Sequence, residues 1–424
     1  MTLVVLPNDL IAEILSFLPV ISLVRFTCVS KSWKTLISDL SFVKLHFNRS
    51  SSTLNPPCTL ISHYSSFQIH TITYTATGNP SVTCYNKDEF AVVPCSMQRL
   101  IENPSIDPYY LFKDKEYNEC SRMADTCNGL VLLLTTADSF SHKCLEYWFR
   151  LSNPATRTTS PKFGHLQGFR LEICSSFNFK LGYDNSTNTY KVVAYCYNPS
   201  KMRSIVRILT VGNNVWRDIK SFPVVPLNIQ WDHNCFWHNG VYFSDTLNWL
   251  AIHNHNDINY NIKNLRVEQF VIVSLDLGTE TYNQYLLPLG FDEVPPAEPK
   301  VGVLGGYLCF SYSSYKETEF VLWQMKKFGI EESWSQLLKI SFQNLRIHYD
   351  AKHNFELTPL LLFGDHILIL NGIQERHPLL YNWRENRVER IQTTASTTFT
   401  DNRPGCDICW YPPNCYIESL VSPI

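Results

Sequence analysis

Three groups of side chains in this sequence have types and spacings that could support chemistry. The stretch Cys406-Asp-Ile-Cys409, followed by Cys415, has the two-residue gap that many zinc sites use. A structural zinc ion needs four ligands, usually from two such pairs, and the sequence contains one pair. We therefore interpret these residues as thiols in a loop and expect no metal ion.

Histidines and carboxylates form the other two groups. The stretch His253-Asn-His-Asn could bind a metal, but its polar surroundings are typical of a solvated loop. Asp276 with Glu280, and Glu331 with Glu332, could form the acid–base pairs that a glycosidase holds across a sugar. They fall on predicted turns, where acidic residues have ordinary structural roles. Because phosphate-binding and hydrolase motifs are also missing from the sequence, we expect no catalytic residue and no cofactor.

Composition narrows the classes of partner. The net charge is −2 and 17% of the 424 residues are charged, which argues against nucleic acid and anionic membranes. The sequence has no apolar run long enough to span a bilayer. No Lys or Arg precedes Arg25, so the basic start of a secretion signal is missing. We therefore expect a cytoplasmic and/or nuclear protein whose 14 cysteines are mostly buried reduced thiols.

The first 47 residues are predicted to form three short helices. Pro7 and Pro19 bound the first helix, and Ser30 can cap the third. Apolar residues recur at helical spacing, and a unit of this size cannot cover all of them. Two interpretations stay equally open here: the helices pack onto the rest of the chain, or the surplus forms an interface.

The rest of the chain is predicted to be mostly antiparallel β structure. Residues 48–95 form a connecting segment with the first strands, and residues 96–424 form one large β domain. Tight turns that start apolar strands begin at residues 128, 239, 305 and 364, in steps of 111, 66 and 59 residues. Asp- or Asn-rich turns recur within 183–190, 210–216, 275–282 and 381–388. Such a period favours a β-propeller over a β-sandwich with insertions.

The order of residues at the start carries a specific resemblance. The sequence Leu6-Pro-x-Asp-Leu-x-x-Glu-Ile-Leu-x-x-Leu-Pro-Val-x-Ser-Leu-x-Arg-Phe-x-Cys-Val-Ser-Lys-Ser-Trp33 resembles the F-box of plant F-box proteins. The resemblance implies three helices that dock on the Skp-type adaptor of a Skp–cullin–F-box ubiquitin ligase. It places in that contact, or in the small core behind it, Leu6, Pro7, Leu10, Ile14, Leu15, Pro19, Leu23, Val29, Ser30 and Trp33.

The second part resembles the F-box-associated domain of the same plant proteins, often labelled F-box/kelch-repeat. The motifs that carry this resemblance include Cys127-Asn-Gly-Leu-Val-x-Leu, Asn153-Pro-Ala-Thr-Arg157, Leu181-Gly-Tyr-Asp184 and Tyr416-Ile-Glu-Ser-Leu-Val-Ser-Pro423. One departure is Asp245-Thr-Leu-Asn-Trp249, where the family has Gly-Ala-Leu-His-Trp, so we expect an altered turn there. Together the resemblances imply an α+β chain with a three-helix F-box and a β-propeller-like domain.

The function implied is recruitment of a target protein to a ubiquitin ligase, by a subunit that is not itself an enzyme. The partners would be a Skp-type adaptor, cullin through it, and an unidentified target that binds the β domain. Ile21 and Thr27 replace residues that are usually basic in the family, which leaves open a decoy or non-degradative F-box protein. A further alternative is a propeller enzyme or glycan-binding propeller with an accessory helical module.

Overall fold

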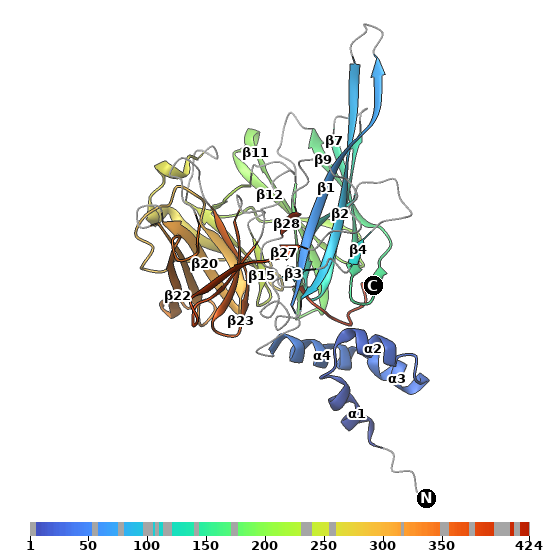
Figure 1. Cartoon of the computed structure of the whole chain (residues 1–424). Helices are drawn as coiled ribbons and strands as arrows, with labels where there is room; N and C mark the ends of the chain where they lie inside the picture. Colours follow the sequence, from blue (N-terminus) through green and yellow to red (C-terminus); the bar gives the residue numbers. More distant parts are fainter. Residues whose placement is uncertain are drawn as a thin grey trace, which may run out of the picture.

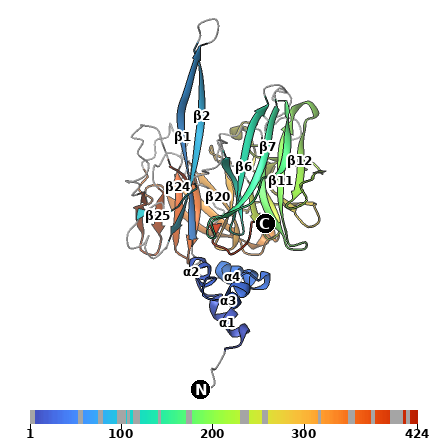
Figure 2. The same cartoon turned by 90° about the vertical axis from the view of Figure 1, so that its right-hand side faces the viewer.

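The computed structural model describes most of the chain, with gaps between its segments. The described residues are 6–52, 58–74, 80–95, 105–106, 110–112, 121–139, 144–170, 177–229, 240–253, 260–314, 318–347, 356–372, 378–393, 408–410 and 416–423. Helices come first and a large β domain follows, so the predicted α+β class is confirmed. In both views the helices lie against one end of the β domain, and the β1–β2 hairpin projects from the other end (Figures 1 and 2).

The N-terminal module contains four helices, so the prediction of three was wrong by one. They are α1 (Asn8–Leu15), α2 (Val20–Phe26), α3 (Lys31–Ile37) and α4 (Leu40–Ser52). The missed helix begins after Asp39, whose Oδ1 accepts hydrogen bonds from the backbone N–H groups of Ser41, at 2.9 Å, and Phe42, at 3.4 Å. A hydrogen bond from the Ser41 side chain, together with these two backbone hydrogen bonds, lowers the pKa of Asp39. A capping aspartate therefore starts a helix that continues beyond the predicted boundary at residue 47.

Six antiparallel sheets of four or five strands make up most of the described β domain. The first contains β1 (Cys58–Tyr74), β2 (Pro80–Cys95), β4 (Tyr110–Phe112), β28 (Ile408–Trp410) and β29 (Tyr416–Ile417). The second contains β5 (Ser121–Cys127), β6 (Leu130–Ser139), β7 (Cys144–Asn153), β8 (Thr158–Thr159) and β9 (Phe163–Arg170). The third contains β10 (Asn178–Asp184), β11 (Thr189–Asn198), β12 (Arg203–Thr210) and β13 (Trp216–Ile219).

The fifth and sixth sheets have the same up-and-down order as the third, whereas the fourth differs. The fourth contains β14 (Val225–Pro226), β15 (Val241–Phe243), β16 (Thr246–Ile252), β17 (Phe270–Asp276) and β18 (Tyr282–Tyr285). In this sheet both β14 and β15 pair with β16. The fifth contains β19 (Lys300–Leu304), β20 (Tyr307–Ser314), β21 (Glu319–Met325) and β22 (Trp334–Ser341). The sixth contains β23 (Leu357–Phe363), β24 (Ile367–Gly372), β25 (Leu379–Asn382) and β26 (Arg387–Arg390).

Apolar cores lie between neighbouring sheets. One core lies between the second and third sheets, and the next lies between the third and fourth. Two more lie between the fourth and fifth sheets and between the fifth and sixth. Both faces of the third, fourth and fifth sheets are therefore buried, as in β11, where Val192 belongs to one core and Val193 to the next.

The ring closes where the start of the β domain meets its end. β28 and β29 pair with β1, and β27 (Gln392–Thr393) pairs with β3 (Ser105–Ile106). Sheets that stack side by side in a closed ring form a β-propeller, so the predicted architecture is confirmed and each sheet is a blade.

One turn geometry recurs in four blades. At Asn153, Asp184, Asp276 and Asn382, the side-chain Oδ1 accepts hydrogen bonds from the backbone N–H groups two and three residues later. The residue four positions on has a positive φ in each case, and these residues are Arg157, Asn188, Glu280 and Asn386. Short polar side chains that bond their own backbone favour this geometry. Three of the four lie in the Asp- and Asn-rich stretches recognised in the sequence.

These turns gather on one face of the propeller. The turn between β10 and β11 reaches the turn between β15 and β16, because Asn185 donates to Asp245. Arg217, at the start of β13, pairs with Glu280 in the turn between β17 and β18. We call the surface formed by the first-to-second and third-to-fourth strand turns of the second to sixth blades the hairpin face. The opposite face carries the connections between second and third strands and between blades.

The fourth blade departs from the predicted turn. Asn128-Gly129 and Gly305-Gly306 form two-residue hairpin turns as predicted, with positive φ throughout. In the fourth blade the hairpin turn lies at Ser244-Asp245, with φ of 50° and 63°, and not at Asn239-Gly240. Asn239 is outside the described residues, and Gly240 directly precedes β15. Asp245 occupies the position of the family's glycine and has the positive φ that glycine adopts readily.

Changing Ser244 to glycine is expected to stabilise the protein by about 0.5–1 kcal/mol, because glycine adopts positive φ without steric cost. Ser244 is exposed, so no packing is lost. The change is measured by urea unfolding. Ser244→Val provides the opposite test, since a β-branched residue should lose at least about 1 kcal/mol at this φ. Equal stabilities of the glycine and valine variants would contradict the assignment of strain.

Candidate functional site

The first helix has two apolar faces. On its inner side Leu15 is buried and packs in a small core with Leu23, Ile37 and Phe42. On its outer side Leu10 is 51% exposed and Ile14 is 57% exposed. Because residues four apart lie above one another on a helix, these two side chains form one outward stripe. The apolar surplus that the sequence indicated is therefore divided between a core and an open surface.

The structure divides the ten residues assigned to adaptor contact in the same way. Seven are exposed, two are buried and Trp33 is intermediate. The exposed ones are Leu6, Pro7, Leu10, Ile14, Pro19, Val29 and Ser30. The buried ones, Leu15 and Leu23, belong to the small core that the resemblance placed behind the contact. Ser30 has a local role as predicted, because its Oγ accepts the Trp33 backbone N–H at 3.1 Å and caps α3.

Three exposed large apolar residues of the helical module were missing from that set, namely Phe17, Ile21 and Leu40. Phe17 follows α1 and is 70% exposed, and the guanidinium of Arg49 in α4 lies 4.3 Å from its ring centroid. Arg49 also pairs with Glu13, which ties α4 to α1. Ile21, at a position that is usually basic in the resembling family, is exposed as well. The signal for Phe17 was present, since it lies seven residues after Leu10 and continues the outward stripe.

The stripe lies on the end of the helical module that is remote from the β domain. In both views α1 is the helix farthest from the strands, and α4 lies next to them (Figures 1 and 2). The module contacts the hairpin face, where Lys44 Nζ donates to Asn188 Oδ1 at 2.6 Å. The exposed apolar side chains of α1 are therefore free of the β domain and open to a separate partner.

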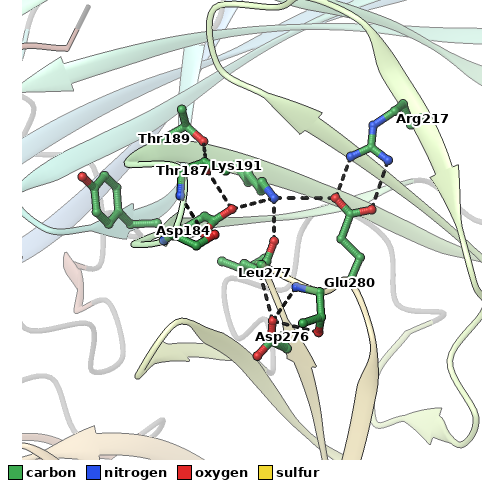
Figure 3. A network of polar contacts seen from close by, with 12 residues as sticks. Asp184, Thr187, Thr189, Lys191, Arg217, Asp276, Leu277 and Glu280 are labelled. Atoms are coloured by element: carbon green, nitrogen blue, oxygen red, sulfur yellow. Dashed lines mark hydrogen bonds and ion pairs between the residues drawn. The ribbon is translucent and has the colours of Figure 1, made fainter.

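A polar cluster in the described part of the β domain joins the third and fourth blades (Figure 3). Lys191 of β11 lies with its Nζ 2.9 Å from Asp184 Oδ2 and 3.6 Å from Glu280 Oε1. Its Nζ also donates to the Leu277 carbonyl at 2.5 Å. On the other side of Glu280, Arg217 donates to both carboxylate oxygens, at 3.1 and 2.6 Å.

Every acid in this cluster has a structural partner. Burial opposes ionisation of Asp184, but hydrogen bonds from Ser186, Lys191 and Thr187 outweigh it and hold its pKa well below the usual range. Asp276 accepts hydrogen bonds from its own turn. A general acid needs a raised pKa, so Asp184 is unsuited to that role. We interpret the cluster as a link between blades.

A second group of acids lies on the opposite face. Burial raises the pKa of Glu298, which accepts hydrogen bonds from the Asn228 amide and, at 3.0 Å, from the Tyr260 hydroxyl. Lys300 pairs with Glu356 nearby. Because the hydrogen bonds reach both oxygens of Glu298, and the second acid is held by a lysine, we interpret this group as a junction of three blades.

Only some of the remaining candidates from the sequence lie within the described residues. Glu331 accepts the backbone N–H of Leu286 at 2.7 Å, which is an ordinary turn contact. Cys406, Cys415 and His255 lie outside the described residues. Among the residues that are described, no group of three or more His, Cys, Asp or Glu is placed to hold a metal ion. The described helices include none that is long and apolar enough to cross a membrane.

Comparison with known families assigns both parts of the chain. Residues 3–45 match the F-box domain, and residues 81–412 match the F-box associated beta propeller domain. The chain belongs to the F-box-associated β-propeller family. The helical module is thus an F-box, and the outward stripe of α1 is part of it.

The names of two relatives from Arabidopsis thaliana mention both an F-box and kelch repeats. An F-box/kelch-repeat protein is 27% identical over 79% of this chain and 79% of its own length. An F-box/LRR-repeat/kelch-repeat protein is 24% identical over 98% of this chain and 96% of its own length. Among solved structures, the NanB sialidase from Streptococcus pneumoniae is similar over 81% of this chain and 89% of its own, with 9% identity and a TM-score of 0.37. A score this low carries no functional argument.

Proposed function

We propose that this F-box protein is the substrate-recognition subunit of a Skp–cullin–F-box ubiquitin ligase. The observation that carries the proposal is the divided first helix, which closes the F-box core with Leu15 and leaves Leu10 and Ile14 exposed. An exposed apolar stripe on a small module, pointing away from the rest of the chain, is typical of a protein interface. The matching F-box domain supports a Skp-type adaptor as the partner.

The mechanism would be proximity. The F-box would hold the adaptor and, through it, cullin, while the propeller would present a bound protein to the ubiquitin-conjugating enzyme. Because the helices contact the hairpin face, the target would bind the opposite face of the propeller. No residue of this chain would take part in bond formation, and the protein would work in the cytoplasm and/or nucleus.

The proposal is tested by stepwise assembly. The full-length chain is mixed first with a Skp-type adaptor and then with cullin, and complex formation is followed by size-exclusion chromatography. We expect a binary complex and then a ternary complex. Adaptor binding without cullin would instead favour the decoy function, to which the exposed Ile21 would contribute. Absence of adaptor binding would reject both.

The target is sought by proximity labelling in cells. The full-length protein is compared with a variant that carries aspartate at Leu10 and Ile14. If the chain delivers proteins for degradation, the same proteins should be labelled by both forms and be more abundant with the variant. Labelled proteins whose abundance does not differ would support a non-degradative function.

A further inference from the structure

The segment Glu418–Pro423, which we call the strap, lies between the F-box and the propeller. It follows β29, which pairs with β1, and runs to the turn that begins at Asn153 in the second blade. Figure 1 shows the C-terminal end of the chain on the side of the β domain that faces the helices. Ser419 is fully buried, so the strap is enclosed although it lies near a chain end.

Consecutive side chains of the strap contact different parts of the protein. Leu420 packs against the F-box core of Leu15, Leu23, Ile37 and Phe42. Val421 packs against the core between the second and third blades. Neighbouring residues of an extended chain point to opposite sides, so two successive residues can join two cores. The strap therefore belongs to both domains.

Asn153 holds the strap in place through its side-chain amide. Its Nδ2 donates to the carbonyl oxygens of Ser419, at 2.9 Å, and of Val421, at 2.7 Å. Its Oδ1 accepts the backbone N–H groups of Ala155 and Thr156 in its own turn. The side chain is fully buried and uses its donors on the strap and its acceptor on the turn.

The need for the strap follows from the size of the F-box. The core of this module contains few fully buried apolar side chains, and domains this small usually need additional support. Leu420 supplies part of that support from a position hundreds of residues away in the sequence. The geometry points to a lock: the strap fixes the F-box to the propeller, so that the helices unfold less readily than they would alone. Asn153 is its positioning residue.

The four related turns provide a matched control. Asp replaces Asn at two of these turns, at Asp184 and Asp276, so aspartate is compatible with the turn itself. Asn153→Asp keeps the acceptor for the turn but places a second oxygen against the two strap carbonyls. Asn382→Asp makes the same chemical change at another buried asparagine. Its Oδ1 accepts the backbone N–H groups of Arg384 and Glu385, and among the described residues it makes no hydrogen bond to the strap.

Amide hydrogen exchange of the full-length chain tests the lock. In Asn153→Asp we expect the amides of α2 and α3 to exchange at least about tenfold faster, since unpaired buried carbonyls are costly. The strands β6 and β11 should keep their protection. In Asn382→Asp the helices should exchange at the wild-type rate. Equal loss of protection in β6, β11 and the helices of Asn153→Asp would overturn the proposal, because Asn153 would then support only the propeller.

Leu420→Ala tests the same lock without altering the turn. Truncation of this side chain should speed exchange of α2 and α3 about tenfold and leave the blades unchanged. Helices that exchange at the wild-type rate in Leu420→Ala would overturn the proposal, whatever the result for Asn153→Asp. The measurement uses the chain alone, so its outcome does not depend on whether an adaptor binds.

Discussion

Replacing both Leu10 and Ile14 with aspartate is expected to weaken binding of a Skp-type adaptor at least about a hundredfold, because central apolar contacts dominate interface energies. Both side chains are about half exposed, so they are available for contact and contribute little to the F-box core. Carboxylates at these positions would be buried without partners in an apolar interface. Titration calorimetry with the purified adaptor measures the change.

The folded state provides the control for this experiment. The double variant should keep the wild-type free energy of unfolding, whereas Leu23→Ala should lose about 2–4 kcal/mol because that side chain fills the F-box core. Leu289→Asp places the same charge on a fully exposed apolar residue of the propeller and should bind the adaptor normally. Unchanged affinity in the double variant would reject the stripe as the docking surface.

Lys191→Met is expected to destabilise the propeller by about 3–5 kcal/mol, since removing one partner leaves buried charge uncompensated. Its side chain is 7% exposed and that of Asp184 is 2% exposed. Arg217→Met removes the other cation that holds Glu280, but Arg217 is half exposed. A pair exposed to solvent contributes at most about 1 kcal/mol. In urea unfolding at neutral pH, the loss of unfolding free energy should therefore be several-fold larger for Lys191→Met than for Arg217→Met. Similar losses in the two variants would contradict the assignment of Lys191 as the buried partner of the network.

The same network predicts the direction of an acid effect. The pKa of Asp184 is lowered in the folded state, so its contribution to stability is complete above the unfolded pKa of about 3.9 and is lost as the pH falls through the folded value. Part of that lowering comes from Lys191. Between pH 5 and pH 3 the wild type should consequently lose more stability than Lys191→Met. A steeper loss in the variant would mean that other acids dominate.

The sequence predicted elements wherever local chemistry determines them. Asn128-Gly129 and Gly305-Gly306 identified hairpins, because two successive residues with positive φ require such side chains. The turn at Ser244-Asp245 was misplaced because serine is not a common choice for a positive φ, and the nearby Asn239-Gly240 is the stronger turn signal. The fourth helix was missed because α4 has a weak apolar pattern, although Asp39 is an ordinary capping residue.

Which residues are available for contact could not be read from local pattern. Leu10, Ile14 and Leu15 all fit one broad apolar face of α1, and the tertiary packing alone decides that Leu15 turns inward. The Lys191 network and the strap are harder still. Their partners are separated by 86 residues for Lys191 and Leu277, and by 266 residues for Asn153 and Ser419. Contacts this distant leave no periodic signal in the sequence.

The position of Leu420 has a consequence for how the chain folds during synthesis. The F-box helices leave the ribosome early, but Leu420 and the strands β28 and β29 are made on the order of tens of seconds later. Until then the F-box lacks part of its core, and the ring of blades lacks the pairing that closes it. Under the proposed function, the F-box would therefore reach its full stability for binding an adaptor only after the β domain is finished.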